Sequence, residues 1–111
     1  MAKLGSITYD GISGKEYSFD IYALPGEWNS VTGFYLITKR VRDNINGGHT
    51  HTLLYVGETD DLKVRMSNHH KQNCFGKNNA NCLCWLDESN ENRRLSIESD
   101  ICEKWNPKCN D

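Results

Sequence analysis

The sequence lacks any apolar run that approaches the roughly 20 residues needed to span a membrane. Residues 1–10 also lack the apolar segment of a signal peptide. Only two prolines interrupt the chain, at Pro25 and Pro107. The lack of a membrane-spanning run and of a signal peptide argues against membrane and secreted proteins, so we expect a cytoplasmic protein without a membrane partner. A length of 111 residues, with ordinary globular composition, predicts one domain over residues 1–111.

Cysteine is absent before residue 74, and the cysteines are odd in number. They are Cys74, Cys82, Cys84, Cys102 and Cys109. This distribution argues against a secreted disulfide framework, so we expect reduced, partly buried thiols. A structural zinc site is the alternative, although the spacing of Cys82 and Cys84 is not that of a zinc knuckle. Its candidate ligands are His69, His70, Cys74, Cys82 and Cys84.

The chain has no excess of positive charge. Lys and Arg number 13 against 15 Asp and Glu, a formal net charge of −2. Because phosphate neutralisation dominates nucleic-acid affinity, this balance disfavours tight nonspecific binding. Basic residues nevertheless form two clusters, one of Lys39, Arg40 and Arg42 and one of Lys63, Arg65, His69, His70 and Lys71. The clusters are compatible with a local positive surface, and a solvated helix face is the alternative for the second.

Period-two alternation predicts several short strands. They span Ile7–Tyr9, Glu16–Tyr22, Phe34–Thr38, Thr52–Gly57 and Asn81–Leu86. The first two, separated by a Gly- and Ser-containing stretch at 11–14, predict an N-terminal β-hairpin. The next two are joined by the polar loop 43–48, and the last reads as a third central strand.

Two helices are expected, at Asp61–Lys71 and Asn90–Lys104. Thr59 or Asp60 would cap the first helix, which would place Arg65 and His69 on one face. Residues 72–80 are polar and read as irregular. Pro107 stops the second helix. The predicted fold class is therefore α/β, more narrowly α+β, with a small, mostly antiparallel central sheet flanked by helices.

Glu98 is the main anomaly in the pattern of the last helix. It falls on an apolar stripe at helical spacing, formed by Leu95, Ile101, Cys102 and Trp105. A carboxylate removed from water needs a partner, a proton or a metal. A salt bridge to Arg94 or to Arg65 is the structural alternative to a functional role.

A set of residues at fixed spacing carries a family resemblance. Its elements are Gly33-Phe34-Tyr35, Tyr55-Val56-Gly57, Arg65 ten positions after Tyr55, and Glu98, Pro107 and Asn110 in the order E-x8-P-x2-N. The pattern, from Gly33 to Asn110, resembles the GIY-YIG nuclease family. The stretch from Tyr55 to Arg65 is similar to the excision-repair branch of that family, and His69 is similar to a histidine of the phage homing-endonuclease branch.

The resemblance implies a GIY-YIG-like nuclease core over residues 31–111. Residues 1–30 would be an extension whose hairpin adds strands to one edge of the sheet. The implied activity is that of a metal-dependent endonuclease, which hydrolyses phosphodiester bonds in nucleic acid, with DNA as the expected partner.

The resemblance also implies roles in proton transfer and phosphate binding. Tyr35 would be the general base, either with a lowered pKa or through a relay to Tyr55 or His69, because a free phenol is too protonated at neutral pH. Arg65 would hold and neutralise the scissile phosphate with its planar set of donors.

Two further residues are implied at the metal. Glu98 would bind a single Mg²⁺ or Mn²⁺, which retains several waters and needs few carboxylates. Asn110 would orient Glu98 or the phosphate through its amide. Taken singly, Tyr35 and Tyr55 fit better as cross-strand packing residues, as most strand tyrosines do.

Glu58 departs from the family pattern. The excision-repair branch carries a lysine at this position, and a negative side chain cannot assist a phosphate electrostatically. Two hypotheses follow: a metal-dependent nuclease that a recruiting protein brings to its DNA, or a catalytically inactive module that binds nucleic acid or protein.

Overall fold

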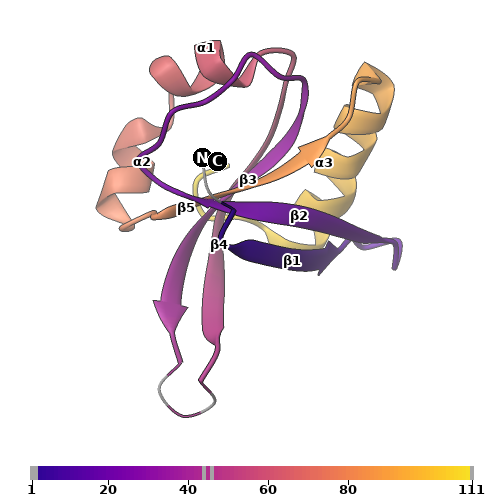
Figure 1. The fold of residues 1–111 in the computed structure, drawn as a ribbon. Helices are drawn as coiled ribbons and strands as arrows, with labels where there is room; N and C mark the ends of the chain where they lie inside the picture. Colours follow the sequence, from indigo (N-terminus) through magenta and orange to yellow (C-terminus); the bar gives the residue numbers. More distant parts are fainter. Residues whose placement is uncertain (1–2, 44, 46, 111) are drawn as a thin grey trace.

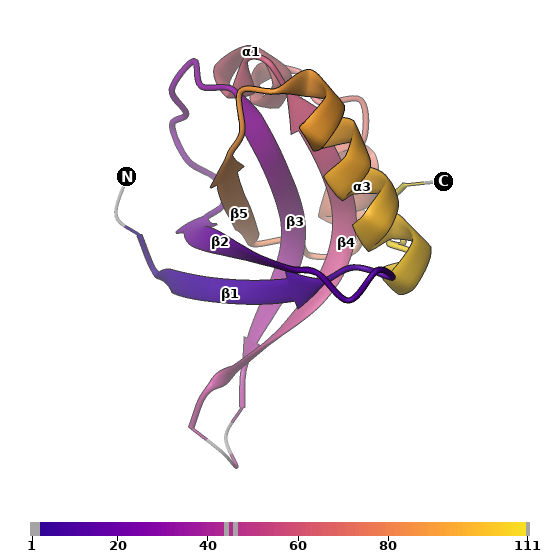
Figure 2. The same cartoon turned by 90° about the vertical axis from the view of Figure 1, so that its right-hand side faces the viewer.

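One antiparallel sheet organises the residues that the computed structural model describes, which are 3–43, 45 and 47–110. Its strands are β1 (Gly5–Asp10), β2 (Glu16–Ala23), β3 (Gly33–Arg42), β4 (His49–Thr59) and β5 (Cys82–Asp87). The helices are α1 (Leu62–Ser67), α2 (Gln72–Lys77) and α3 (Glu91–Trp105). Figure 1 and Figure 2 show the arrangement in two orientations.

Strand β5 lies in the middle of the sheet, between two hairpins. The order is β1-β2-β5-β3-β4, and every neighbouring pair is antiparallel. The β1–β2 hairpin predicted from the alternation occupies one edge, as expected, and the α+β class is confirmed. Strands β3 and β4 are longer than expected, because their pairing continues to Arg42 and His49.

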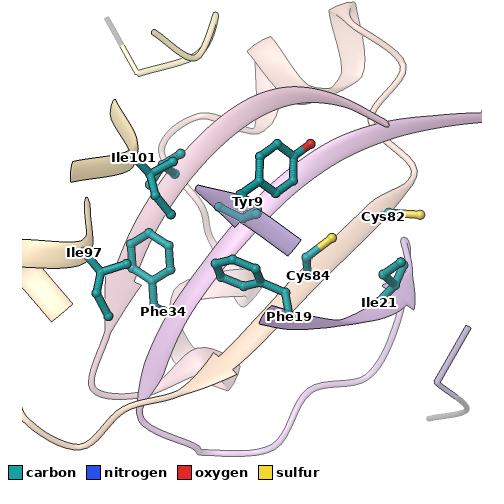
Figure 3. Close-up of a cluster of buried hydrophobic side chains, with 10 residues drawn as sticks. Tyr9, Phe19, Ile21, Phe34, Cys82, Cys84, Ile97 and Ile101 are labelled. Atoms are coloured by element: carbon teal, nitrogen blue, oxygen red, sulfur yellow. The ribbon is translucent and has the colours of Figure 1, made fainter. Parts of the chain in front are cut away.

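The helices cover opposite faces of this sheet. Alternation along β3 directs Phe34 and Leu36 to the face covered by α3, and Tyr35 to the other face, where α1 and α2 pack. Figure 3 shows Phe34 in the core under α3, near Ile97 and Ile101 of that helix. The sheet therefore separates a core under α3 from a core under α1 and α2.

The segment after β4 differs from the sequence prediction. Helix α1 ends at Ser67 and does not continue to Lys71, and its N-cap is Asp61, which accepts a hydrogen bond from the Val64 N–H at 3.1 Å. A second helix, α2, occupies residues predicted to be irregular. That prediction was wrong because the burial of Phe75 against the sheet stabilises a helix that its polar neighbours do not signal.

Helix α3 lies within one residue of its predicted bounds. The Asn90 side chain accepts a hydrogen bond from the Arg93 N–H at 3.1 Å, and the helix stops at Trp105, before Asn106 with its left-handed φ of 47°. This helix has 15 residues. No helix in the described part of the chain is both long and apolar enough to cross a membrane.

The buried stripe of α3 is displaced from the predicted one. Leu95 is 47% exposed and Trp105 is 43% exposed, so these two predicted core positions were wrong. The buried positions are Arg94, Ile97 and Ile101. Glu98 lies at the border of this face and is half-buried. Helical periodicity alone did not indicate that Arg94 would be buried.

Cys74 and Cys109 form a disulfide, with 5.9 Å between their Cα atoms. The expectation of reduced thiols is therefore wrong for this pair. The two residues are 35 positions apart, and only the fold of α2 and the C-terminal tail brings them together. Cys82, Cys84 and Cys102 are free thiols.

The C-terminal tail closes the outer edge of β4. The Cys109 N–H donates to the Leu54 C=O at 2.7 Å. The Asn110 side-chain amide accepts from the Val56 N–H and donates to the Val56 C=O, both at 2.8 Å. This amide supplies the backbone-like pair of hydrogen bonds that an edge strand lacks.

We expect Asn110→Ala to lower the free energy of unfolding by about 1–3 kcal/mol, because both polar groups of Val56 lose their partner. Urea denaturation measures the change. The matched control is Asn92→Ala on the exposed side of α3, expected to stay within about 0.5 kcal/mol of wild type. Equal stability of the two variants would show that the amide does not hold the edge.

Candidate active site

Two tyrosines and a glycine occupy paired positions on β3 and β4. Tyr35 is opposite Gly57, and Tyr55 is opposite Ile37. The ring centroids of Tyr35 and Tyr55 are 5.9 Å apart. A Cβ on Gly57 would lie 2.6 Å from Cε2 of Tyr55 and 2.8 Å from Cζ of Tyr35. The glycine therefore makes room for both phenol rings, a physical reason for the Y-x-G spacing.

His69 is hydrogen-bonded to Tyr35 beneath the sheet. Its Nε2 lies 2.6 Å from the Tyr35 Oη, and its ring is 5.0 Å from that of Tyr55. The prediction that His69 shares a helix face with Arg65 was wrong, because α1 ends at Ser67. His69 instead lies in the turn between α1 and α2, where it is buried.

The proton of the neutral His69 ring is placed by its other nitrogen. Nδ1 accepts a hydrogen bond from the Lys71 N–H at 3.0 Å, so the proton resides on Nε2 and is donated to the Tyr35 Oη. Burial, followed by the charges of His70 and Arg65, lowers the pKa of His69 to about 4. The imidazole is therefore neutral at physiological pH.

Burial shifts both phenols away from ionisation. It raises the pKa of Tyr35, and the neighbouring Tyr55 raises it further, whereas Arg65 lowers it. The pKa of Tyr55 is also raised, first by burial and then by the charge of Glu98, and Arg65 again opposes the shift. The expected lowering of the Tyr35 pKa is thus not found, and Arg65 is the group that acts in that direction.

Arg65 lies in the last turn of α1, beside these phenols. Its Nη1 donates to the Glu58 C=O at 3.2 Å, which ties the guanidinium to the end of β4. A surface cavity of about 410 Å³ opens next to it, with Arg65 and His70 in its lining. The lining also includes Asp60 and Asp61 and contains none of Tyr35, Tyr55 and Glu98, so Arg65 is the group of this cavity that can bind an anion.

Glu58 is held in an ion pair that the sequence did not indicate. Its Oε2 lies 2.7 Å from Nε of Arg94, which is buried within the α3 face. Arg94 also donates from Nη1 to the C=O groups of Glu88 and Ser89. The sequence feature that could have indicated this ion pair is the position of Arg94, one helical turn before Glu98 on the inner face of α3. Glu58 therefore neutralises a buried cation and links β4 to α3.

This ion pair removes Arg94, one of the two arginines considered as a partner for Glu98. Among the described residues Glu98 forms no ion pair, since Arg94 is bound to Glu58. Burial raises the pKa of Glu98, the charge of Glu58 raises it further, and Arg65 lowers it. Electrostatic interaction with Arg65 and Tyr55 places Glu98 near the other candidate residues. A half-buried carboxylate with this unmet demand for positive charge can accept a cation.

The described hydrogen bonds of Asn110 do not include one to Glu98. Both of the described side-chain hydrogen bonds of its amide go to Val56, one residue after Tyr55. The expected orientation of Glu98 by Asn110 is therefore not found. Asn110 instead fixes the strand that carries Tyr55.

The candidate zinc ligands lie on opposite sides of the sheet. Cys82 and Cys84 are buried in the core under α3, whereas His69 packs against Tyr35 and Tyr55 on the other face. Cys74 is bonded to Cys109. Within residues 3–43, 45 and 47–110, no group of three or more His, Cys, Asp or Glu side chains is placed to hold a metal.

Comparisons with protein-family models, with curated proteins and with solved structures find no match to this chain. The case for a function therefore depends on the geometry of the site and on the spacing of its residues.

We expect acid to destabilise the fold through His69. Its folded pKa of about 4 lies below the unfolded value of 6.5, so neutral His69 stabilises the fold fully above pH 6.5. That contribution is lost as the pH falls from 6.5 towards 4, by up to about 3 kcal/mol. Unfolding free energies at both ends of this range, for wild type and His69→Gln, measure it.

The variant should show a weaker dependence on pH over this interval than wild type does. His49→Gln removes an exposed imidazole and serves as the control, which should follow wild type. A pH dependence that His69→Gln leaves unchanged would contradict the assignment of a neutral, buried His69.

Gly57→Ala tests the packing of the two phenols. The added methyl group would overlap Tyr55 and Tyr35, so we expect a loss of about 1–3 kcal/mol in unfolding free energy. Thermal or urea unfolding measures it. Gly48→Ala is the control, because nothing lies within 4 Å of a Cβ at that position. Similar losses in both variants would mean that the rings do not depend on Gly57.

Proposed function

We propose that this chain is a GIY-YIG-type, metal-dependent endonuclease that hydrolyses phosphodiester bonds in DNA. The observation that carries the proposal is the 2.6 Å hydrogen bond between Tyr35 and His69, at a place where Arg65 influences the ionisation of Tyr35, Tyr55 and Glu98. These residues come from β3, β4, α1, the following turn and α3. The spacing of the same residues resembles that of the nuclease family.

Tyr35 is the proposed general base. Because burial disfavours its phenolate, the role requires groups that stabilise that form. The Nε2–H of His69 donates to the Tyr35 Oη, and the Arg65 guanidinium lowers the pKa of this phenol. Together they favour a phenolate that removes a proton from the attacking water. In place of the proton relay expected from the sequence, His69 would stabilise the Tyr35 phenolate by donating a hydrogen bond to it.

Arg65 is the proposed phosphate ligand. Its guanidinium lies on the wall of the surface cavity. Among the described backbone groups, it donates a hydrogen bond to one, the Glu58 C=O. Its other donors can contact two oxygens of a scissile phosphate and offset the charge that grows there during attack.

Glu98 is the proposed ligand for Mg²⁺ or Mn²⁺. The fit rests on its unpaired carboxylate, which burial and the neighbouring Glu58 drive towards protonation unless a cation is close. Such a metal, when bound, supplies Lewis-acid stabilisation of phosphate charge. Glu58, which stands where the excision-repair branch carries a lysine, is ion-paired with Arg94.

A catalytically inactive binding module is the second candidate. The raised pKa values of Tyr35 and Glu98 favour it, because both groups are driven towards their neutral forms. In that case Arg65 would still bind an anionic partner, and turnover would be absent at any metal concentration. A recruiting protein is compatible with either candidate.

The cytoplasmic location stays a prediction. The Cys74–Cys109 disulfide would need a local environment that preserves it, because disulfides are rare in reducing compartments.

Cleavage of linear, nicked and branched DNA with Mg²⁺ or Mn²⁺ tests the proposal. We expect Tyr35→Phe and Glu98→Gln each to lower the cleavage rate about 10²-fold or more, because each removes a group that acts in the transition state. Their DNA affinity should remain within a few-fold of wild type. The matched control is Glu103→Gln, an exposed carboxylate on the same helix, which should cleave at the wild-type rate.

One result would contradict the proposed function, and another would contradict the assignment of Glu98. Folded wild type that binds DNA but cleaves no substrate with either metal would favour the binding module. Full activity in Glu98→Gln would remove Glu98 from the site, even if the enzyme is a nuclease.

A further inference from the structure

The β3–β4 hairpin extends beyond the sheet as a two-stranded arm. Strand β3 pairs with the central strand β5 only as far as Thr38, whereas its pairing with β4 continues from Lys39, opposite Thr52, to Arg42, opposite His49. Figure 1 shows this hairpin projecting away from the helices and from the other strands. We call residues 39–42 and 49–52 the arm.

Two of the three cations of the arm share one face with two histidines. Arg40 is opposite His51 and Arg42 is opposite His49, so these four side chains share one face of the ribbon. Nη2 of Arg40 lies 3.1 Å from Nδ1 of His49. Lys39 points to the opposite face, which gives the ribbon a cation on each side.

These cations lack counter-ions in the described part of the chain. The ion pairs there involve Lys3, Arg93, Arg94 and Lys104, and none involves Lys39, Arg40 or Arg42. The buried Nε of Arg40 has no hydrogen-bond partner. Because the whole chain has a net charge of −2, this local excess of unpaired cations is not a general property of the surface.

The titration of His51 reflects the same field. Burial lowers its pKa, and the charges of Arg40 and His49 lower it further. Its Nδ1 is 2.8 Å from Oγ1 of Thr38, at the base of the arm. An anionic partner would relieve this accumulation of positive charge.

The shape of the arm selects among polyanions. Its two strands lie about 4.8 Å apart, and a two-stranded ribbon fits the major groove of B-form DNA, about 12 Å wide. The deep, narrow major groove of A-form RNA does not admit such an element. Duplex DNA therefore fits the arm better than duplex RNA.

We propose that the arm enters the major groove of duplex DNA and that Lys39, Arg40 and Arg42 bind phosphates beside the cleavage site. This inference rests on the proposed nuclease function, and it names the substrate of that site as a duplex. By the alternation of β3, Lys39 lies on the same face as Tyr35, about 13 Å away at the usual rise of an extended chain, whereas Arg40 and Arg42 lie on the opposite face. That distance is the rise of about four base pairs, so the arm would contact the duplex on one side of the scissile bond.

The experiment compares binding of a short duplex DNA between about 50 and 200 mM salt, in the Glu98→Gln background without metal. We expect Lys39→Ala/Arg42→Ala to weaken the affinity at least about tenfold and to reduce the slope of log K against log salt by about 2. Lys77→Ala/Lys108→Ala removes the same charge from exposed sites off the arm and should change the affinity less than about threefold.

Substitutions of Lys39 and Arg42 are expected to leave the protein folded. No hydrogen bond or ion pair with another described residue holds the side chains of Lys39 and Arg42. Circular dichroism and thermal melting check this, and Arg42→Glu, a charge reversal at the most exposed of the three cations, should weaken binding more than Arg42→Ala does. Equal effects of the arm and control pairs, or an unchanged salt slope, would overturn the proposal.

A cleavage assay on chains with Glu98 intact separates the two proposals. If both hold, Lys39→Ala/Arg42→Ala raises KM and leaves kcat near wild type. Cleavage with an unchanged KM would overturn the arm and leave the nuclease standing. Arm-dependent DNA binding by a wild type that cleaves nothing would do the reverse. Duplex RNA bound as tightly as duplex DNA would overturn the choice of the major groove.

Discussion

The closure of the β4 edge by the C-terminal tail is the interaction on which the rest of the site depends. Strand β4 carries Tyr55 and Gly57, yet it has a neighbouring strand on one side only. The Asn110 amide pairs with Val56 between them, and the disulfide ties the adjacent Cys109 to α2. A strand held on both sides keeps its register, and the register is what sets Gly57 opposite Tyr35.

The pairing of charges around this strand follows from the same geometry. Glu58 and Arg65 leave the end of β4 and the helix after it, while Arg94 and Glu98 come from α3. With Arg94 bound to Glu58, Glu98 has no ion-pair partner among the described residues, and Arg65 lowers the pKa values of Glu98 and Tyr55. Under the proposed function, Arg65 would bind the phosphate and Glu98 the cation.

Much of the fold could be predicted from local patterns. The alternation in β1, β2 and β5 and the capping residues of α3 act over a few positions, so their bounds follow from the sequence. The end of α1 and the formation of α2 depend on where Phe75 and His69 pack, which is a long-range property. The buried Arg94 was missed for the same reason, since its partner Glu58 lies 36 positions earlier.

Part of the candidate site could also be predicted from the sequence. The resemblance to the nuclease family identified Tyr35, Tyr55, Arg65, His69 and Glu98 as candidates, and the fold brings them into mutual contact or electrostatic range. It could not reveal that Asn110 bonds to a backbone, or which ring nitrogen of His69 carries the proton. Both depend on single hydrogen bonds to main-chain groups, which have no signature in residue type.

The central position of β5 also constrains how the chain is made. During synthesis the β1–β2 and β3–β4 hairpins emerge early, each from neighbouring residues, but the strand that joins them follows only at residues 82–87. Until then, β2 and β3 each present an open edge that β5 will later fill. The nascent chain is therefore most exposed to aberrant strand pairing in the interval before β5 leaves the ribosome, and insertion of that one segment completes the sheet.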